Sequence, residues 1–108
     1  MELSISHDEK VRRFSCRVDG HDCVVDYDKR EDVIDIHHTF VHADLRGKGI
    51  AEMLLRAISD YARETGLRVI PSCSYAVLFY KRHKEYASVL SKDADLENGG
   101  SCRLPNKL

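Results

Sequence analysis

The sequence lacks several features that define whole classes of protein. Its 108 residues carry a net charge of only −1, which gives no electrostatic reason to expect nucleic acid or an anionic membrane as a partner. No apolar run approaches the ~20 residues that a membrane-spanning helix needs, and the opening MELSISHDEK has no apolar segment typical of a secretory signal. We therefore expect a cytoplasmic protein whose four cysteines are reduced thiols.

The sequence also offers no convincing set of metal ligands. There is no Cys-x-x-Cys pair, the spacing that many structural zinc sites use. His37 and His38 are neighbours in an expected strand, so their side chains should point to opposite faces. They could not then hold one ion together with His42. We expect no metal.

A β-hairpin is predicted around Asp19-Gly20, because Asp-Gly favours the two-residue turns that join antiparallel strands. Strands are expected over residues 11–18 and 21–27. The two-residue turn places Cys16 opposite Cys23. That pairing is compatible with a disulfide or half a metal site, but two thiols packed as small apolar side chains are the favoured interpretation in a reducing compartment.

A third strand is predicted over residues 33–41. Alternation along a strand places Ile36, His38 and Phe40 on one face and Thr39 on the other. The remaining elements follow from helical periodicity, from stop signals such as Gly66 and from the capping serines Ser72 or Ser74. They are a helix beginning near Gly49, a strand over 67–70 that ends at Pro71, a helix over 74–83 and a short helical segment over 86–90.

The order β-β-β-α-β-α predicts a small mixed α/β (α+β) domain. Its mainly antiparallel sheet should have about four strands flanked by helices. We expect one domain over residues 1–90 with a frayed start over 1–10. A flexible tail is expected over 91–108, where the composition turns polar.

The junction between the third strand and the first helix carries the strongest functional signal. Two glycines allow a tight turn and a close backbone approach to a ligand. The helix N-terminus presents free N–H groups and a favourable dipole for an anion, and two cationic residues stand at the same place. A strand, a basic glycine loop and a helix in this order predict a phosphate-binding loop. Its residues are Arg46, Gly47, Lys48, Gly49, Ile50 and Ala51.

This loop differs from two common phosphate-binding patterns. A Walker loop ends in Gly-Lys-Ser/Thr, whereas Lys48 is followed by Gly49. A dinucleotide fingerprint needs a third glycine. The loop instead resembles the R-x-x-G-x-A motif of the GNAT superfamily of acetyltransferases, with Arg46, Gly49 and Ala51 at the motif positions. The resemblance implies that the loop binds the pyrophosphate of acetyl-CoA, while Phe40 and Val41 offer backbone groups to its pantetheine arm.

Two further motifs extend the resemblance over about half of the chain. The sequence is similar to the small, single-domain YjdJ-type acetyltransferase group, in which a strand ending in His-Thr precedes the glycine loop and a Pro-Ser-Cys-Ser-Tyr segment follows the helix. Here these are His38-Thr39 and the segment over residues 71–75. The resemblance implies that Cys73 is the active-site cysteine.

His38 and Cys73 are the first candidates for chemistry. Amine acetylation needs a base, and a histidine imidazole is largely neutral at pH 7 and accepts a proton directly or through water. Cys73 precedes a helix N-terminus, a position that favours the thiolate, so a covalent acetyl-cysteine is possible. The alternatives are a histidine packed in the sheet and an inert buried thiol.

Tyr80 is a weaker candidate. Many GNAT proteins carry N-x-x-A-x-x-x-Y, whose tyrosine protonates the leaving thiolate, and Cys73, Ala76 and Tyr80 occupy the corresponding positions. Cysteine replaces the asparagine, and the Gly-Phe that often follows is missing. Both departures put the acid role in doubt, and a tyrosine packed in the core is the alternative.

These residues together predict an acetyl-CoA-dependent N-acetyltransferase of minimal size, acting on an amine of a small molecule or peptide. The alternative is a module that binds CoA or acetyl-CoA without catalysis. Both use the same loop, and they differ in whether His38 and Cys73 surround the thioester.

Overall fold

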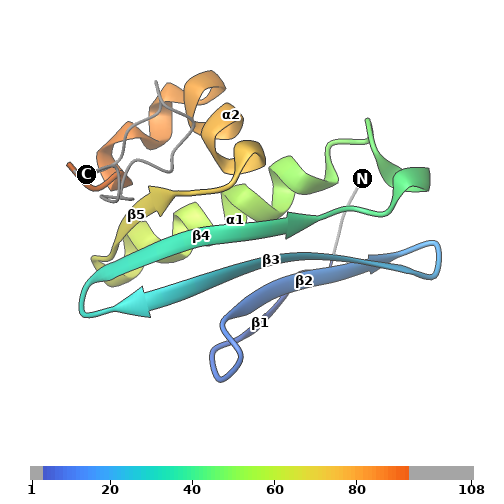
Figure 1. Ribbon diagram of the computed structural model, residues 1–108, viewed down its shortest axis with the longest axis horizontal. Coiled ribbons are helices and arrows are strands. Elements are labelled where there is room, and N and C mark those ends of the chain that lie inside the picture. The colour runs from blue at the N-terminus through green and yellow to red at the C-terminus, as the bar shows by residue number, and fades with distance from the viewer. Residues whose placement is uncertain (1–3, 93–108) are drawn as a thin grey trace, which may run out of the picture.

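The computed structural model describes residues 4–92, which form one five-stranded sheet with helices (Figure 1). The strands lie in the order β1-β2-β3-β4-β5, and β4–β5 is the parallel pair. The mixed α+β class is confirmed, with five strands rather than about four. The strands are β1 Ser6–Asp8, β2 Arg13–Val18, β3 His21–Arg30, β4 Val33–Phe40 and β5 Arg68–Pro71; the helices are η1 Ala43–Leu45, α1 Ile50–Thr65, α2 Ser74–Arg82 and η2 Lys84–Val89.

The additional strand is β1, in a segment predicted to be frayed. It pairs antiparallel with β2. His7 anchors it by stacking on Phe14, with ring centroids 3.9 Å apart, and by a 2.6 Å hydrogen bond between His7 Nε2 and the Tyr27 hydroxyl. The polar composition of the first ten residues gives no sign of these contacts, because the partners of His7 lie on β2 and β3.

The predicted hairpin is confirmed. Asp19 and Gly20 both adopt positive φ, 52° and 80°, as the favoured two-residue turns require. Cys16 faces Cys23 across the pair of strands, and both are free, buried thiols.

The predicted alternation of β4 is wrong beyond Ile36. Tyr27 of β3 faces Ile36, but the next residue back, Asp26, faces His38, so His37 is an extra residue in a β-bulge. Thr39, opposite the fully buried Val25, therefore continues the core face. His38 shares the other face with Phe40 but not with Ile36.

The bulge also corrects the prediction for His37. Asp26 and Asp28 lie on the same face of β3, because they are two residues apart. His38 is opposite Asp26, and His37 Nε2 lies 3.7 Å from a carboxylate oxygen of Asp28. The two histidines therefore lie on one face rather than on opposite faces.

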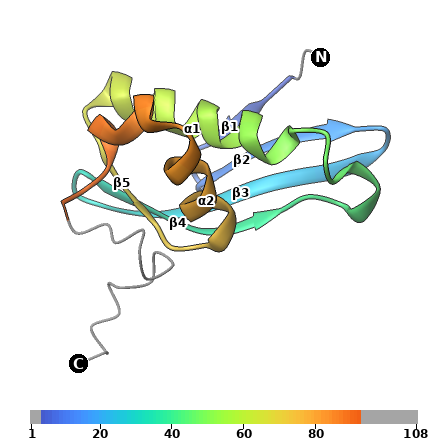
Figure 2. The same cartoon turned by 90° about the horizontal axis from the view of Figure 1, so that it is seen from above.

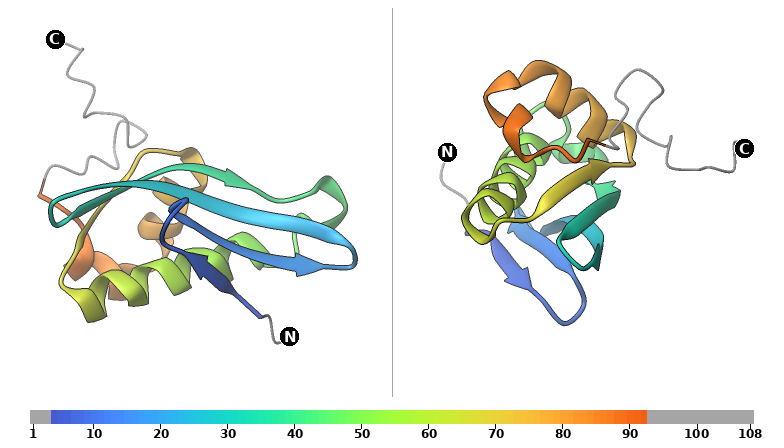
Figure 3. Two further views of the ribbon diagram at one scale, coloured as in Figure 1. Left: turned by 90° about the horizontal axis from the view of Figure 1, so that it is seen from below. Right: turned by 90° about the vertical axis from the view of Figure 1, so that its left-hand side faces the viewer.

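Helix α1 packs on the core face of the sheet, and α2 packs on α1 and on the β4–β5 edge (Figures 1 and 2). No helix of residues 4–92 covers the opposite face of β2–β4, which we call the helix-free face (Figure 3). Gly49 and Gly66 bound α1 as predicted. No helix in this part of the chain is long and apolar enough to cross a membrane.

Pairing between β4 and β5 ends at Pro71, as predicted. The N–H groups of Ser72 and Cys73 then both donate to the carbonyl of Ile36, at 2.9 and 3.1 Å, and the chain turns into α2. Cys73 is the N-cap residue of α2, rather than the predicted Ser72 or Ser74.

The end of the described residues is tied to β5. The Ser91 N–H donates to the carbonyl of Val69 at 2.8 Å, and Leu90 forms a parallel bridge with the same residue. Of the predicted tail over residues 91–108, all but Ser91 and Lys92 lie outside the described residues.

Candidate functional site

An open cavity of about 200 Å³ lies between the N-terminus of α1 and the exposed side of α2. The glycine loop forms one wall, and α2 forms the other. The predicted phosphate-binding loop is thus at a cavity. Six of the eight predicted cofactor-binding residues line it: Val41, Arg46, Gly47, Gly49, Ile50 and Ala51.

The backbone of the loop has the geometry of an anion-binding site. Gly47 and Gly49 adopt φ values of 86° and 80°, which L side chains rarely adopt. No atom lies within 4 Å of a Cβ built on either glycine, so the space beside the backbone is open. Gly49 also has no side chain to cap α1. The first N–H groups of the helix, which lack partners within the helix, therefore face this space.

Cationic side chains surround the loop unevenly. The Arg46 Nε donates to the carbonyl of Val41 at 3.2 Å, which holds the guanidinium at the cavity wall. Lys48 is exposed and is not among the lining residues. Arg82, near the end of α2, lines the opposite wall. An anion in the cavity would lie between two arginines from different elements.

The apolar residues of the wall formed by α2 were missed by reasoning from sequence. Tyr75, Leu78 and Phe79 line the cavity, and Leu78 remains 47% exposed. An apolar side chain left exposed on a helix is consistent with contact to a ligand. The signal was present as the spacing of residues 75, 78, 79 and 82, but a helix of nine residues that is apolar on two sides does not reveal which side faces the core.

Charged side chains connect α1 with α2 at the rim of the cavity. His83 Nε2 lies 2.9 Å from a carboxylate oxygen of Glu52 in the first turn of α1, and its Nδ1 lies 3.2 Å from an Nη of Arg56. Arg56 also approaches Glu85 at 3.5 Å. This network links the two walls at the rim.

Phe40 does not line the cavity. Its side chain lies on the helix-free face, 43% exposed. Val41 is buried, and its carbonyl is the acceptor for Arg46.

The Cys73 thiol lies at the point where β4 and β5 separate. Its Sγ is 3.2 Å from the Thr39 hydroxyl, and either atom can be the donor. Cys73 is partly exposed. The bulge produces this contact, because it turns Thr39 onto the core face.

His38 is exposed on the helix-free face. The structure therefore does not place it against Cys73. The two candidates lie on either side of the same segment of β4.

Tyr80 lies in the core, only 2% exposed, with its hydroxyl against that of Ser59. Ser59 Oγ in turn donates to the carbonyl of Leu55 at 2.7 Å. Burial raises the pKa of Tyr80 well above its ordinary value. The side chain does not reach the cavity, so this arrangement favours a packing role over that of an acid.

Comparisons with known proteins agree with this geometry. A family model described as GCN5-related N-acetyl-transferase matches residues 13–89. The match includes the β4 bulge, the glycine loop, α1 and α2.

Individual relatives are similar over most of their length. The protein NATD1 of Danio rerio is 37% identical over 90 residues, which cover 78% of this chain and 81% of that protein. NATD1 of Bos taurus is 34% identical over 85 residues, covering 75% and 74%. A solution structure of a GCN5-like protein from Staphylococcus aureus superposes with a TM-score of 0.67 at 30% identity, covering 82% of this chain and 88% of that one.

Proposed function

The chain belongs to the GCN5-related N-acetyltransferase family, and from that premise we propose that it binds acetyl-CoA in the cavity and transfers the acetyl group to an amine. One observation carries the proposal: two glycines with positive φ and an uncapped helix N-terminus lie on the wall of one cavity. Backbone N–H groups in this arrangement suit a pyrophosphate.

The residues present also fit the rest of the ligand. The pairing of β4 with β5 ends at Ile36, so the β5-facing edge of β4 from His37 onward has no strand partner among residues 4–92. An extended amide chain such as pantetheine can bind to such an edge by main-chain hydrogen bonds. In this arrangement it passes Val41 and ends near Thr39 and Cys73.

In direct transfer, the amine loses its proton to a base and its nitrogen bonds to the thioester carbonyl carbon. The carbon–sulfur bond then breaks, and the released thiolate takes up a proton. His38 is the proposed base. It stands on the open helix-free face, so an amine of a small molecule or a peptide can reach it from solvent.

In the relayed route, Cys73 loses its proton and its thiolate attacks the same carbon; the bond from that carbon to the sulfur of CoA breaks, and the released thiolate takes up a proton. The amine then loses a proton and bonds to the carbon of the acetyl-cysteine, whose carbon–sulfur bond breaks and frees the Cys73 thiolate. The Thr39 hydroxyl, 3.2 Å from Sγ, is placed to orient the thiol in this route. Tyr80 has no part in either route, because its hydroxyl is buried against Ser59.

Binding is tested by calorimetry with CoA on the wild type and a Gly49→Glu variant. A carboxylate at the loop should repel the pyrophosphate and weaken binding at least about tenfold, a loss of about 1.4 kcal/mol. Gly66→Glu is the matched control, since Gly66 bounds the other end of α1 with a similar φ of 76° and equally open space. No binding by the wild type, or equal weakening by both variants, would contradict the proposal.

A CoA-binding module without catalysis is the second candidate. It is favoured by the absence of contact between His38 and Cys73, which lie on opposite faces of β4. Mass spectrometry of the intact protein after incubation with acetyl-CoA, with and without amines, separates the two functions. If CoA binds but neither an amine nor Cys73 becomes acetylated, the protein is a CoA-binding module rather than an enzyme.

A further inference from the structure

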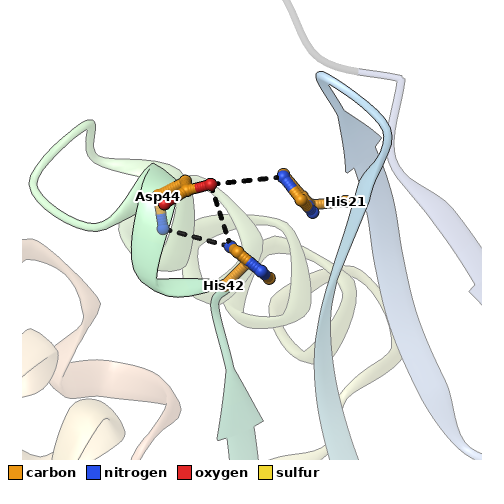
Figure 4. A group of neighbouring side chains, drawn as sticks. All are labelled: His21, His42 and Asp44. Carbon is orange, nitrogen blue, oxygen red and sulfur yellow. Dashed lines mark hydrogen bonds and ion pairs between the residues drawn. The ribbon is translucent and has the colours of Figure 1, made fainter.

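A second cluster of side chains able to do chemistry lies outside the cavity. His21 is the first residue of β3, His42 directly precedes η1, and Asp44 lies within η1 (Figure 4). None of them lines the cavity. We propose that these three side chains form a binding site for a divalent transition-metal ion, with zinc the best fit.

The separations of the three ligand atoms support this proposal. Asp44 Oδ2 lies 3.6 Å from His21 Nε2 and 3.8 Å from His42 Nδ1, and one such atom from each residue lies within 4.8 Å of the others. Tetrahedral bonds of about 2.1 Å to zinc place neighbouring ligand atoms about 3.4 Å apart. Small side-chain movements close the difference.

One rearrangement is needed for the ion to bind. The imidazoles of His21 and His42 are stacked, with centroids 3.7 Å apart and an interplanar angle of 13°, so their in-plane lone pairs lie in two nearly parallel planes and cannot both point at one ion. At least one ring must turn about its Cβ–Cγ bond, a torsion with broad preferences in histidine. His42 Nδ1 must also release the N–H of Asp44, which it accepts at 3.1 Å.

The surroundings permit this movement. The side chains of His21 and His42 are 32% and 39% exposed, so a turning ring does not disrupt the core. Two neutral imidazoles and one carboxylate are ligands that suit zinc. Water can complete the fourth position, because the cluster is open to solvent.

The other histidine clusters among residues 4–92 fit an ion less well. His83 has the cation Arg56 within 3.2 Å, which would repel a metal. His37 has one carboxylate, that of Asp28, at 3.7 Å. His38 lies on the same face as His37, but these side chains form no group of three ligand atoms among the described residues. His37 is therefore a matched control: an exposed histidine beside a single aspartate.

The position of the site gives the ion a structural consequence. It would connect the β2–β3 hairpin end with η1, the turn that leads into the glycine loop. Sequence reasoning missed the site because His21 and His42 are 21 positions apart and meet only when β3 and β4 pair. An ion that binds only the folded chain would raise its stability with concentration.

Calorimetry with Zn²⁺ on the full chain tests the proposal, alongside His21→Ala, Asp44→Asn and His37→Ala. We expect one strong site per chain, a dissociation constant raised at least about 30-fold by either of the first two changes, and no change for His37→Ala. NMR of the imidazoles should show zinc-dependent shifts for His21 and His42 and none for His37. Thermal melts confirm that each variant is folded.

Three results would overturn the proposal. The wild type could fail to bind zinc at millimolar concentration. The His21→Ala and Asp44→Asn variants could bind as tightly as the wild type. Binding could also disappear on alkylation of the cysteines while the imidazole signals stay unshifted, which would assign the metal to thiols.

Discussion

The two halves of β4 have opposite characters. Residues 33–36 pair with β3 on one side and with β5 on the other, and Ile34, Asp35 and Ile36 are buried. Among the described residues, 38–40 pair with β3 alone, and most of the side chains over 37–40 are exposed. The bulge at His37 divides them. One continuous strand thus contributes its first half to the core, while the β5-facing edge of its second half has no strand partner among residues 4–92.

The largest expected effect lies in the second half. If transfer is direct, His38→Ala should lower the acetylation rate by about 10²- to 10⁴-fold, the usual contribution of a positioned base, while Cys73→Ala keeps most activity. If transfer is relayed, Cys73→Ala should abolish turnover and the acetyl adduct together. Steady-state assays with a panel of amines measure both.

The bulge supplies a matched control for that experiment. His37 lies on the same face as His38 and is similarly exposed, so His37→Ala should leave the rate nearly unchanged. Equal losses in the His37 and His38 variants would mean that neither side chain acts as the base and that the difference between the two halves of β4 is not catalytic.

The next-largest expected effect is a difference in stability between substitutions in the two halves of β4. Ile36 is fully buried, so Ile36→Ala should lower the free energy of unfolding by about 2–5 kcal/mol. Phe40 is 43% exposed, so Phe40→Ala should cost less than about 1 kcal/mol. Urea unfolding followed by circular dichroism measures both. A large loss at Phe40 would mean that its face is covered.

The sequence predicted those parts of the molecule whose determinants are local. Asp19 and Gly20 specify their own turn, which then sets the register between Cys16 and Cys23. The glycine loop, with α1 between Gly49 and Gly66, follows in the same way, because capping and positive φ depend on a few adjacent residues. The wall of the candidate site that the glycine loop forms was therefore predictable.

The remaining features depend on contacts between distant segments. A bulge has no reliable local signature, and here it reverses the alternation that placed His38 with Ile36. The contact between Thr39 and Cys73 joins residues 34 positions apart. Strand β1 was missed because its anchor is a hydrogen bond between His7 and Tyr27, which lies twenty residues further along the chain.

The smallest expected effect is a difference in alkylation rate between two cysteines. One lies beside the second half of β4, and the other lies in the paired β2–β3 region. Cys73 is partly exposed next to the free half of β4. Cys16 lies in the paired region, where burial and the neighbouring Cys23 raise its pKa to about 11. Only a small fraction of the protein molecules carry Cys16 as a thiolate at pH 8. A more basic thiolate is a stronger nucleophile, but this only partly compensates for the small ionised fraction. Iodoacetamide should therefore modify Cys73 at least about tenfold faster.

Peptide mapping by mass spectrometry measures this difference in labelling rate, and CoA should protect Cys73.

The raised pKa of Cys16 also makes the stability of the fold depend on pH. The unfolded chain loses the Cys16 proton at lower pH than the folded chain does. The contribution of the protonated Cys16 thiol to the stability of the fold is therefore complete below about pH 9 and is lost as the pH rises to about 11. If Cys16 reacted as fast as Cys73 at pH 8, the hairpin would have to open readily, and the contrast between the closed and free parts of the sheet would fail.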